Sequence, residues 1–306
     1  MRTVRVRVPA TTANLGPALD CAGMALNIFN EVLVAESDED VVVVEGEGSQ
    51  FLPNDKTNLV YRAIASVSAR IGIRTPSLRI ECRNNIPLSR GLGSSAAAIV
   101  GGIVAANSLL NAELSTQDLL DLAVRMEGHP DNIAPALLGG VVVSCADKRR
   151  GVVAARMGVP SDLVAVIAIP EYHLSTEKSR AVLPKSVPYE DAVFNVCRAS
   201  LLVVALQQGR YDLLKTAMED RLHQPYRSCL VPGLEQVIEA AIGSGAVGAC
   251  MSGAGPSVVA FCVGEERKII RGVGEAMSLA FRDSGVSCSI MVAKPADAGA
   301  LDNVEH

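Results

Sequence analysis

The chain has 306 residues, of which 49% are hydrophobic and 20% charged, and its formal net charge is −5. This composition excludes a disordered chain, and the absence of a basic run argues against a nucleic-acid-binding surface. The longest nearly apolar run, residues 96–110, is shorter than the roughly 20 residues of a membrane span and predicts a buried helix instead. We therefore expect two globular domains and a small-molecule partner, with neither nucleic acid nor membrane involved.

The N-terminus and the cysteines both favour a cytoplasmic protein. Residues 1–8 alternate charged side chains with valine, unlike the continuous apolar segment of a signal sequence. The eight cysteines include no Cys-x-x-Cys pair and lie mostly in apolar segments. Such cysteines suit reduced, packed thiols better than disulfides or a zinc site.

Periodicity in the first half predicts strands alternating with amphipathic helices. Strands are expected at 4–8, 41–44 and 78–82, and a further one at 141–145. Helices are expected over 59–71 and directly after Ser115, which forms a capping-box-like start with Asp118. A polar segment and a loop with Gly158 and Pro160 follow, so we expect an N-terminal domain of 1–157 and a C-terminal domain of 158–306.

The second half has the element order βαββαβ with an insertion, which predicts a ferredoxin-like arrangement. The polar tail, residues 297–306, is expected to fray. The expected elements are a strand at 163–169, a mostly helical insertion at 176–221, a helix at 234–242, strands at 246–251 and 257–263, a helix at 265–281 and a strand at 286–292.

The segment 87–98, Pro-Leu-Ser-Arg-Gly-Leu-Gly-Ser-Ser-Ala-Ala-Ala, predicts a phosphate-binding loop. Gly91 and Gly93 permit backbone conformations that a Cβ would forbid, and the uncapped N–H groups of a helix starting near Ser94 attract an anion. The segment is neither a Walker loop nor a dinucleotide fingerprint, so another kind of nucleotide loop is implied. A tight turn leading into a buried helix is the alternative reading of these residues.

Three further clusters of small and polar residues could carry chemistry. Residues 9–23 follow the first strand and supply Asn14 and Asp20, and residues 127–132, Glu-Gly-His-Pro-Asp-Asn, are expected to form a loop after a helix stop at Gly128 and Pro130. Residues 251–257 are expected to join the two central strands of the ferredoxin-like domain. Taken alone, the first cluster is explained as a turn and the third as a glycine hairpin, whereas the second is equally well explained as a solvated loop.

Together, these segments resemble the GHMP kinase superfamily and, within it, the homoserine kinases. Residues 87–97 are similar to the superfamily's ATP-binding motif. Residues 127–136 with the following Gly139-Gly140 are similar to the segment that distinguishes homoserine kinases from mevalonate and galactose kinases. One departure is Ala18-Leu19, where family members commonly carry Gly-Phe. Because alanine restricts the backbone and leucine lacks an aromatic ring, we expect this departure to alter the fine shape of the acceptor pocket.

The resemblance covers nearly the whole chain and implies its fold and activity. The implied fold is α+β, with an N-terminal domain like ribosomal protein S5 domain 2 and a C-terminal ferredoxin-like domain, in a homodimer. The implied reaction is the ATP- and Mg²⁺-dependent phosphorylation of the side-chain hydroxyl of L-homoserine, a step towards threonine.

The resemblance also implies site residues, which we group by role. The metal ligands would be Ser95 and Glu127. ATP would be bound by Pro87, Leu88, Ser89, Arg90, Gly91, Leu92, Gly93, Ser94, Ser95, Ala96, Ala97, Ser252, Gly253 and Gly255. Homoserine would be bound by Asn14, Asp20, His129, Asn132, Thr176, Arg180 and Arg227, and the catalytic residues would be Asn14, Glu127, Asp131 and Asn132.

The chemistry of each side chain indicates which group of the substrate it would bind. Asp20 suits an ammonium group, and Arg180 and Arg227 suit a carboxylate through bidentate pairing. Asp131 is either a general base or a residue that only positions the hydroxyl, because an alcohol can also lose its proton directly to the phosphoryl group.

Two other functions fit the same sequence. One is a kinase of the same fold that phosphorylates another small alcohol, such as mevalonate. The other is a nucleotide-binding regulator that has kept the fold and lost catalysis, against which the presence of Ser95, Glu127 and Asp131 argues.

Overall fold

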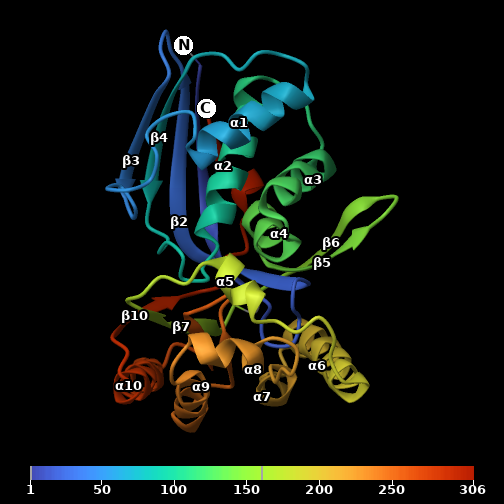
Figure 1. The fold of residues 1–306 in the computed structure, drawn as a ribbon, viewed down its shortest axis with the longest axis vertical. Helices are drawn as coiled ribbons and strands as arrows, with labels where there is room; N and C mark the ends of the chain where they lie inside the picture. Colours follow the sequence, from blue (N-terminus) through green and yellow to red (C-terminus); the bar gives the residue numbers. More distant parts are fainter. Residues whose placement is uncertain (1, 160) are drawn as a thin grey trace.

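The computed structural model, which describes residues 2–159 and 161–306, has an upper and a lower half, each built on one β-sheet (Figure 1). The expected domain ranges include Met1 and Pro160, which lie outside the described residues. The strands are β1 (Thr3–Ala13), β2 (Ala22–Glu36), β3 (Val41–Gly46), β4 (Leu78–Asn84), β5 (Val141–Asp147), β6 (Gly151–Met157), β7 (Leu163–Pro170), β8 (Gly248–Met251), β9 (Val258–Val263), β10 (Cys288–Ala293) and β11 (Val304–Glu305).

The helices confirm the expected mixture of α and β structure. None of them, within the described residues, is both long and apolar enough to cross a membrane. They are α1 (Leu59–Arg70), α2 (Ser94–Leu109), α3 (Thr116–Glu127), α4 (Pro130–Leu138), α5 (Thr176–Ala181), α6 (Tyr189–Gln208), α7 (Leu214–Ala217), α8 (Gln224–Arg227), α9 (Leu234–Gly243) and α10 (Arg267–Asp283), with the 3-10 turns η1 (Tyr211–Leu213), η2 (Ser228–Leu230) and η3 (Ala300–Asp302).

The upper sheet has the strand order β11-β1-β2-β4-β3, with β5 paired to β2 and β6 paired to β5. Helices α2 and α4 pack against this sheet. Alternating residues Val4, Val6 and Val8 of β1 enter the core, and α2 is buried along most of its length, as its apolar composition predicts. This packing fixes the N-terminus of α2 at the lower edge of the upper half (Figure 1).

The lower sheet is antiparallel in the order β10-β7-β9-β8, the ferredoxin-like arrangement that the sequence predicts. Val164, Val166 and Ala168 of β7 face the core between the lower sheet and helices α9 and α10. Leu163 and Ile167, on the other face of β7, join the core shared with the upper half. The two halves therefore meet through buried apolar side chains rather than through a solvated linker.

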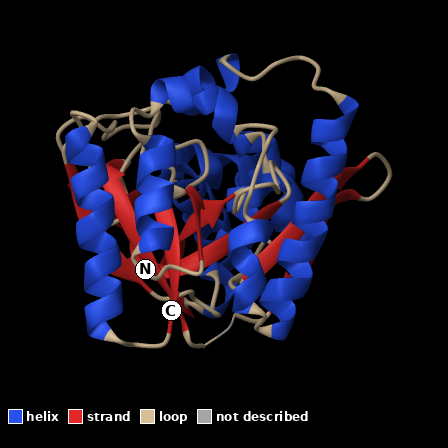
Figure 2. Ribbon diagram, turned by 90° about the horizontal axis from the view of Figure 1, so that it is seen from below, coloured by secondary structure: helices blue, strands red, loops and turns tan. Residues whose placement is uncertain are grey.

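Several local expectations are wrong. Strands β2 and β6 and helix α4 were not predicted from the sequence, and β8, which was expected to be a central strand, lies at the edge of the lower sheet. The tail does not fray: Val304 pairs with Val6 in the upper sheet, and Ala300 is fully buried. The two termini consequently lie close together (Figure 2).

Candidate active site

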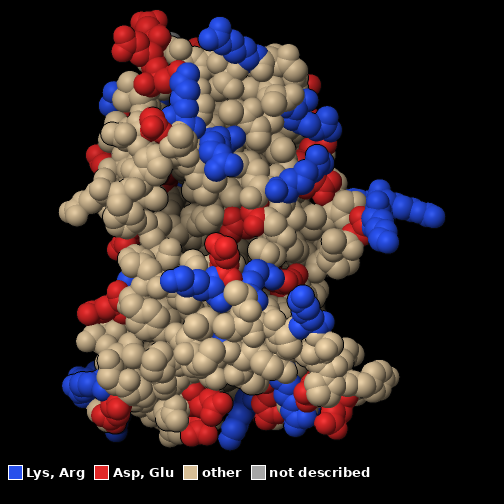
Figure 3. All heavy atoms as spheres, viewed as in Figure 1, with Lys and Arg blue, Asp and Glu red and all other residues tan. Residues whose placement is uncertain are grey.

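A cavity of about 490 Å³ lies between the two halves of the molecule. The space-filling view shows the surface hollowed at mid-height, with acidic and basic side chains beside the hollow (Figure 3). The walls come from the loop at 87–93, the N-terminal ends of α1, α2, α4 and α5, and the loop that carries Asn14 and Asp20. The cavity thus gathers all four motif clusters of the sequence.

The N-terminus of α2 forms the anion-attracting wall of the cavity. Its N-cap is Gly93, at φ 73°, so in the described chain no side chain caps the first-turn N–H groups near Ser94. A Cβ on Gly93 would lie 2.0 Å from Thr11 Oγ1, and one on Gly91 would lie 2.1 Å from the carbonyl oxygen of Ser252. Only glycine fits at these two positions, which leaves the backbone N–H groups exposed to a phosphate.

Some residues expected to bind ATP lie behind the cavity wall. Ala96 and Ala97 are fully buried in α2, and so is Ser252, whose Oγ donates to the carbonyl oxygen of Gly91 at 2.7 Å. Gly253 accepts through its carbonyl oxygen from Asn14 Nδ2 at 2.8 Å. These residues support the loop, whereas the rest of the expected set, residues 87–95 and Gly255, lines the cavity.

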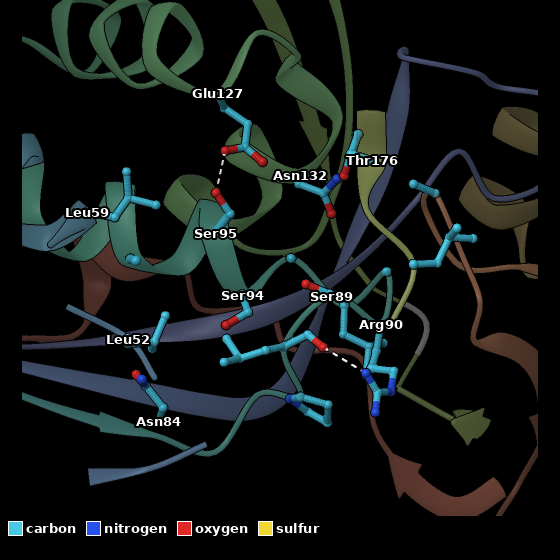
Figure 4. Close-up of a pocket in the computed structure, with 18 of the residues that line it drawn as sticks. Leu52, Leu59, Asn84, Ser89, Arg90, Ser94, Ser95, Glu127, Asn132 and Thr176 are labelled. Carbon is cyan, nitrogen blue, oxygen red and sulfur yellow. Dashed lines mark hydrogen bonds between the residues drawn. The ribbon is translucent and has the colours of Figure 1, made fainter. Parts of the chain in front are cut away.

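Arg90 holds the loop against the lower half. Its Nε donates to the carbonyl oxygen of Pro170 at 2.6 Å, and its Nη2 donates to that of Glu171 at 2.7 Å. Figure 4 shows Arg90 below Ser89, with Ser94 on the other side of the loop. The guanidinium therefore joins the loop to the end of β7.

Ser95 and Glu127 place two oxygen atoms that could bind a metal ion beside the N-terminus of α2. Ser95 Oγ donates to Glu127 Oε2 at 2.7 Å (Figure 4). Burial raises the pKa of Glu127, and the hydrogen bond from Ser95 opposes that shift only in part. A hydroxyl and a carboxylate beside a phosphate site are ligands that suit Mg²⁺, so the residues present fit that ion.

The expected loop at 127–132 is half helix. Gly128 ends α3 with φ 95°, but Pro130 begins α4 instead of terminating a helix, because proline is favoured in the first helical turn. His129 is the N-cap, and Asp131 and Asn132 occupy the first turn. Asn132 Oδ1 accepts a hydrogen bond from Thr11 Oγ1 at 2.8 Å, which fixes the orientation of its amide.

Asp131 is the most strongly perturbed carboxyl group of the cavity. Its side chain is 4% exposed, and burial, together with the negative charge of Asp20, raises its pKa to about 7. The pKa of the neighbouring His129 is lowered, first by burial and then by the positive charge of Arg180. At neutral pH the site therefore holds an imidazole that is predominantly neutral and a carboxyl group that readily exchanges its proton.

Asp20 and Arg180 form an ion pair in the cavity. Arg180 Nη1 donates to Asp20 Oδ2 at 3.1 Å, and Nη2 donates to Asp20 Oδ1. Arg180 Nε is buried and has no hydrogen-bond partner among the described residues. The backbone N–H of Asp20 donates to Asn14 Oδ1 at 3.0 Å.

The remaining expected acceptor residues lie close by. Thr176 begins α5 and lines the cavity. Arg227 also lines it, although its side chain is almost fully buried. Every residue expected to bind the acceptor thus reaches this cavity, and Asp20 and Arg180 satisfy each other within it.

One end of the cavity is mostly apolar and was not predicted from the sequence. Val44, Leu52, Leu59, Cys82 and Asn84 line this end, and Figure 4 shows Leu52, Leu59 and Asn84 beyond Ser94. They come from β3, β4, α1 and the intervening segment, so no local motif joins them. An apolar slot with an amide beside it suits a planar heterocycle.

Comparison with protein families gives two matches along the chain. Residues 58–140 match the family described as GHMP kinases N terminal domain, and residues 202–279 match the one described as GHMP kinases C terminal. The first match contains the loop at 87–93 and the segment 127–132, and the second contains α8, α9 and most of α10.

Relatives of known name are similar over almost the entire chain. The homoserine kinase of Moorella thermoacetica is 47% identical over 97% of this chain and 98% of its own length. The homoserine kinase of Carboxydothermus hydrogenoformans is 46% identical over 99% and 98%, respectively.

Solved structures of kinases are similar to this chain in fold. The homoserine kinase of Cytophaga hutchinsonii has a TM-score of 0.86 at 32% identity, covering 98% of this chain and 96% of that one. The L. major mevalonate kinase has a TM-score of 0.71 at 15% identity over 96% and 97% of the two chains, a likeness of fold alone.

Proposed function

Because the chain belongs to the homoserine kinases of the GHMP kinase superfamily, we propose that it transfers the terminal phosphoryl group of ATP to the side-chain hydroxyl of L-homoserine. The product is O-phospho-L-homoserine, an intermediate of threonine biosynthesis. One observation carries the proposal: a single cavity has an anion-binding helix N-terminus on one side and a carboxylate–guanidinium pair on the other.

The donor nucleotide occupies the loop side in this proposal. The base lies in the apolar slot near Leu52 and Leu59, and the phosphates lie against the N–H groups at Ser94 and Ser95. Ser95 and Glu127 hold Mg²⁺, which supplies charge neutralisation on the phosphate oxygens. The half-buried carboxylate of Glu127 is well suited to this role, because its hydrogen bond to Ser95 keeps both oxygen ligands together.

In this proposal, the acceptor binds by replacing the ion pair between Asp20 and Arg180 with its own charged groups. Homoserine is a zwitterion, so its ammonium group takes Asp20 while its carboxylate takes Arg180 and Arg227. The exchange leaves the charge balance of the pocket unchanged, and the unpartnered Nε of Arg180 gives that side chain an additional donor for the carboxylate. A fixed pair of opposite charges thereby favours an amino acid over an uncharged alcohol.

The hydroxyl of homoserine lies near the first turn of α4 in this arrangement. Asp131 accepts its proton as the oxygen attacks the phosphorus, and the raised pKa of Asp131 is close to the optimum for a general base at neutral pH. Asn132, His129 and Asn14 orient the hydroxyl and the substrate backbone. The bond from Thr11 leaves the Nδ2 of Asn132 free to donate to a substrate oxygen.

The other candidate functions receive less support. Mevalonate has no ammonium group, so Asp20 would lose its partner when Arg180 turned to the substrate carboxylate. A regulator without catalysis would not need Asp131 or the Ser95–Glu127 pair in the same cavity. ADP release with a panel of small alcohols tests the proposal: homoserine should be the best acceptor, and equal release with mevalonate would reject it.

Three further features of the protein remain proposals. Family resemblance supports a homodimer, and the distribution of the cysteines supports the cytoplasm. A domain division between 157 and 158 is supported by the end of β6 at Met157 and the start of β7 at Leu163.

A further inference from the structure

A buried histidine contacts the guanidinium of Arg227 behind the cavity. His223 is fully buried, and its Nδ1 lies 3.1 Å from Arg227 Nη1. The other ring nitrogen, Nε2, lies 2.6 Å from the carbonyl oxygen of Gly16. Gly16 belongs to the loop between Asn14 and Asp20, so one imidazole ring connects two parts of the acceptor site.

The two partners fix the tautomer of His223. A guanidinium can only donate hydrogen bonds, so Nδ1 must accept, and a carbonyl oxygen can only accept, so Nε2 must carry the proton. Burial lowers the pKa of His223, with Asp220 opposing and Arg227 reinforcing the shift. The ring is therefore neutral at physiological pH, with its acceptor nitrogen directed at Arg227.

Asp220 holds the histidine in place from the other side. Its Oδ2 accepts from the backbone N–H of His223 at 3.0 Å and of Gln224 at 2.6 Å. Its Oδ1 accepts from Asn195 Nδ2 at 2.7 Å. These backbone contacts anchor the start of α8. Asp220 Oδ2 also lies 3.5 Å from His223 Nε2, farther than the carbonyl oxygen of Gly16 at 2.6 Å, so the short hydrogen bonds of the ring are those with Arg227 and Gly16.

Arg227 needs such an anchor because its other contacts are backbone carbonyl oxygens. Its Nε donates to Ser179 at 3.1 Å and its Nη1 to Gly253 at 3.2 Å. The carbonyl oxygen of Gly253 also accepts from Asn14 Nδ2. The direction of the guanidinium is therefore set jointly by α5, the loop after β8 and His223.

We propose that His223 is a positioning residue for the acceptor carboxylate, which orients the guanidinium of Arg227 through Nδ1 and ties it through Nε2 to the loop that carries Asn14 and Asp20. This inference rests on the proposed function, since Arg227 is one of the two groups that receive the carboxylate. His223 acts through Arg227 and the loop at Gly16, and it does not itself line the cavity.

Two variants with amide side chains test the roles of His223 Nδ1 and Nε2 separately. The amide of His223→Asn lies near the position of Nδ1 and can still accept from Arg227, whereas the longer His223→Gln reaches the position of Nε2 and serves Gly16 alone. We expect His223→Gln to raise the KM for homoserine about tenfold, and His223→Asn by less than about threefold, with the KM for ATP within about twofold in both.

A double variant that also lacks the Arg227 guanidinium shows whether His223→Gln changes the KM for homoserine through Arg227. In Arg227→Met, the change His223→Gln should have no further effect on the KM for homoserine, because the group that it positions is gone. Gln224→Leu is the structural control on the same helix: it removes the acceptor of the Met251 backbone N–H, at 2.8 Å, and should lower the melting temperature without the selective KM effect.

Each outcome decides one claim. Equal effects of His223→Gln on homoserine and ATP, or an undiminished effect in Arg227→Met, would overturn the positioning role. If His223→Gln does not fold, His223→Asn decides, because an increase of about tenfold in its KM for homoserine would also contradict the role of Nδ1. A wild-type protein that turns over no homoserine would instead refute the proposed function itself.

Discussion

Asp131 lies in the electrostatic field of Asp20 within one cavity. Burial is the larger cause and the negative charge of Asp20 the second, and together they raise the pKa of Asp131 to about 7, while Arg180 opposes the shift. A carboxyl group in this state is protonated in acid and ionised just above neutral pH. In the proposed reaction, the negative charge of Asp20 therefore acts on the carboxyl group that would accept the hydroxyl proton.

The first prediction concerns the pH dependence of activity. The kcat/KM of the wild type should fall as pH decreases through about 7, because a protonated Asp131 cannot accept the hydroxyl proton. Asp131→Asn should lower kcat about a hundredfold, leave measurable activity and remove this step from the profile. A variant profile with the same step would show that another group titrates.

The second prediction concerns stability, and its sign follows from the same pKa. Asp131 has a pKa of about 7 in the folded state against an unperturbed value of 3.8, so the folded state binds the proton more tightly between these values. The free energy of unfolding that the protonated Asp131 contributes is therefore lost as pH rises from 3.8 to above about 7. Asp131→Asn should therefore melt about 2 °C or more above the wild type at pH 8, with the gain shrinking towards pH 4.

Calorimetry at both pH values measures this difference. The matched control is Asp38→Asn, which alters an exposed carboxylate and should leave the pH dependence of melting unchanged. A gain for Asp131→Asn that is larger in acid than at pH 8 would contradict the assigned direction of the shift.

The third prediction tests the metal site. Glu127→Gln should raise the Mg²⁺ concentration needed for half-maximal activity on the order of tenfold, because one anionic ligand is lost. Glu190→Gln, an exposed residue in the first turn of α6, is the control. An unchanged magnesium titration of Glu127→Gln would exclude Glu127 as a ligand.

The fourth prediction tests the phosphate loop. Gly91→Ala places a Cβ against the carbonyl oxygen of Ser252, so we expect a displaced loop and an increase of at least about tenfold in the KM for ATP. Gly264 has a similar φ of +75°, but apart from Gly264 itself and its two chain neighbours, no heavy atom of the described chain lies within 4 Å of its Cβ position. Gly264→Ala should cost about 1 kcal/mol of stability and leave the KM for ATP unchanged. Equal kinetic effects of the two changes would argue against the tight contact at Gly91.

The fifth prediction tests the ion-pair exchange. Asp20→Asn and Arg180→Met should each raise the KM for homoserine about 10- to 100-fold, because each removes a charge-assisted hydrogen bond to the zwitterion. The KM for ATP should stay within about twofold. Comparable increases for both substrates would mean that the pair supports the cavity rather than the acceptor.

Local signals predicted the loop side of the site well. The glycines at 91 and 93, the start of α2 at Ser94 and the capping box at Ser115 are properties of neighbouring residues, and the structure has each of them. The ferredoxin-like strand order follows similarly from element order, because few topologies satisfy βαββαβ.

Features made by distant residues could not be predicted in the same way. The apolar slot joins Val44 and Cys82, which become neighbours only through the pairing of β3 with β4. The contact between His223 and Gly16 spans the two halves, and the pairing of Val304 with Val6 depends on the path of the whole chain. Asp131 was found by motif, but its raised pKa depends on burial, which only the folded structure determines.

The most direct test of the central claim is mass spectrometry of the products formed from ATP, Mg²⁺ and L-homoserine. We predict that homoserine gains one phosphoryl group on its side-chain oxygen, in an amount equal to the ADP released, and that Asp20→Asn sharply reduces this product at limiting homoserine. ATP binding without any phosphorylated homoserine would contradict the account.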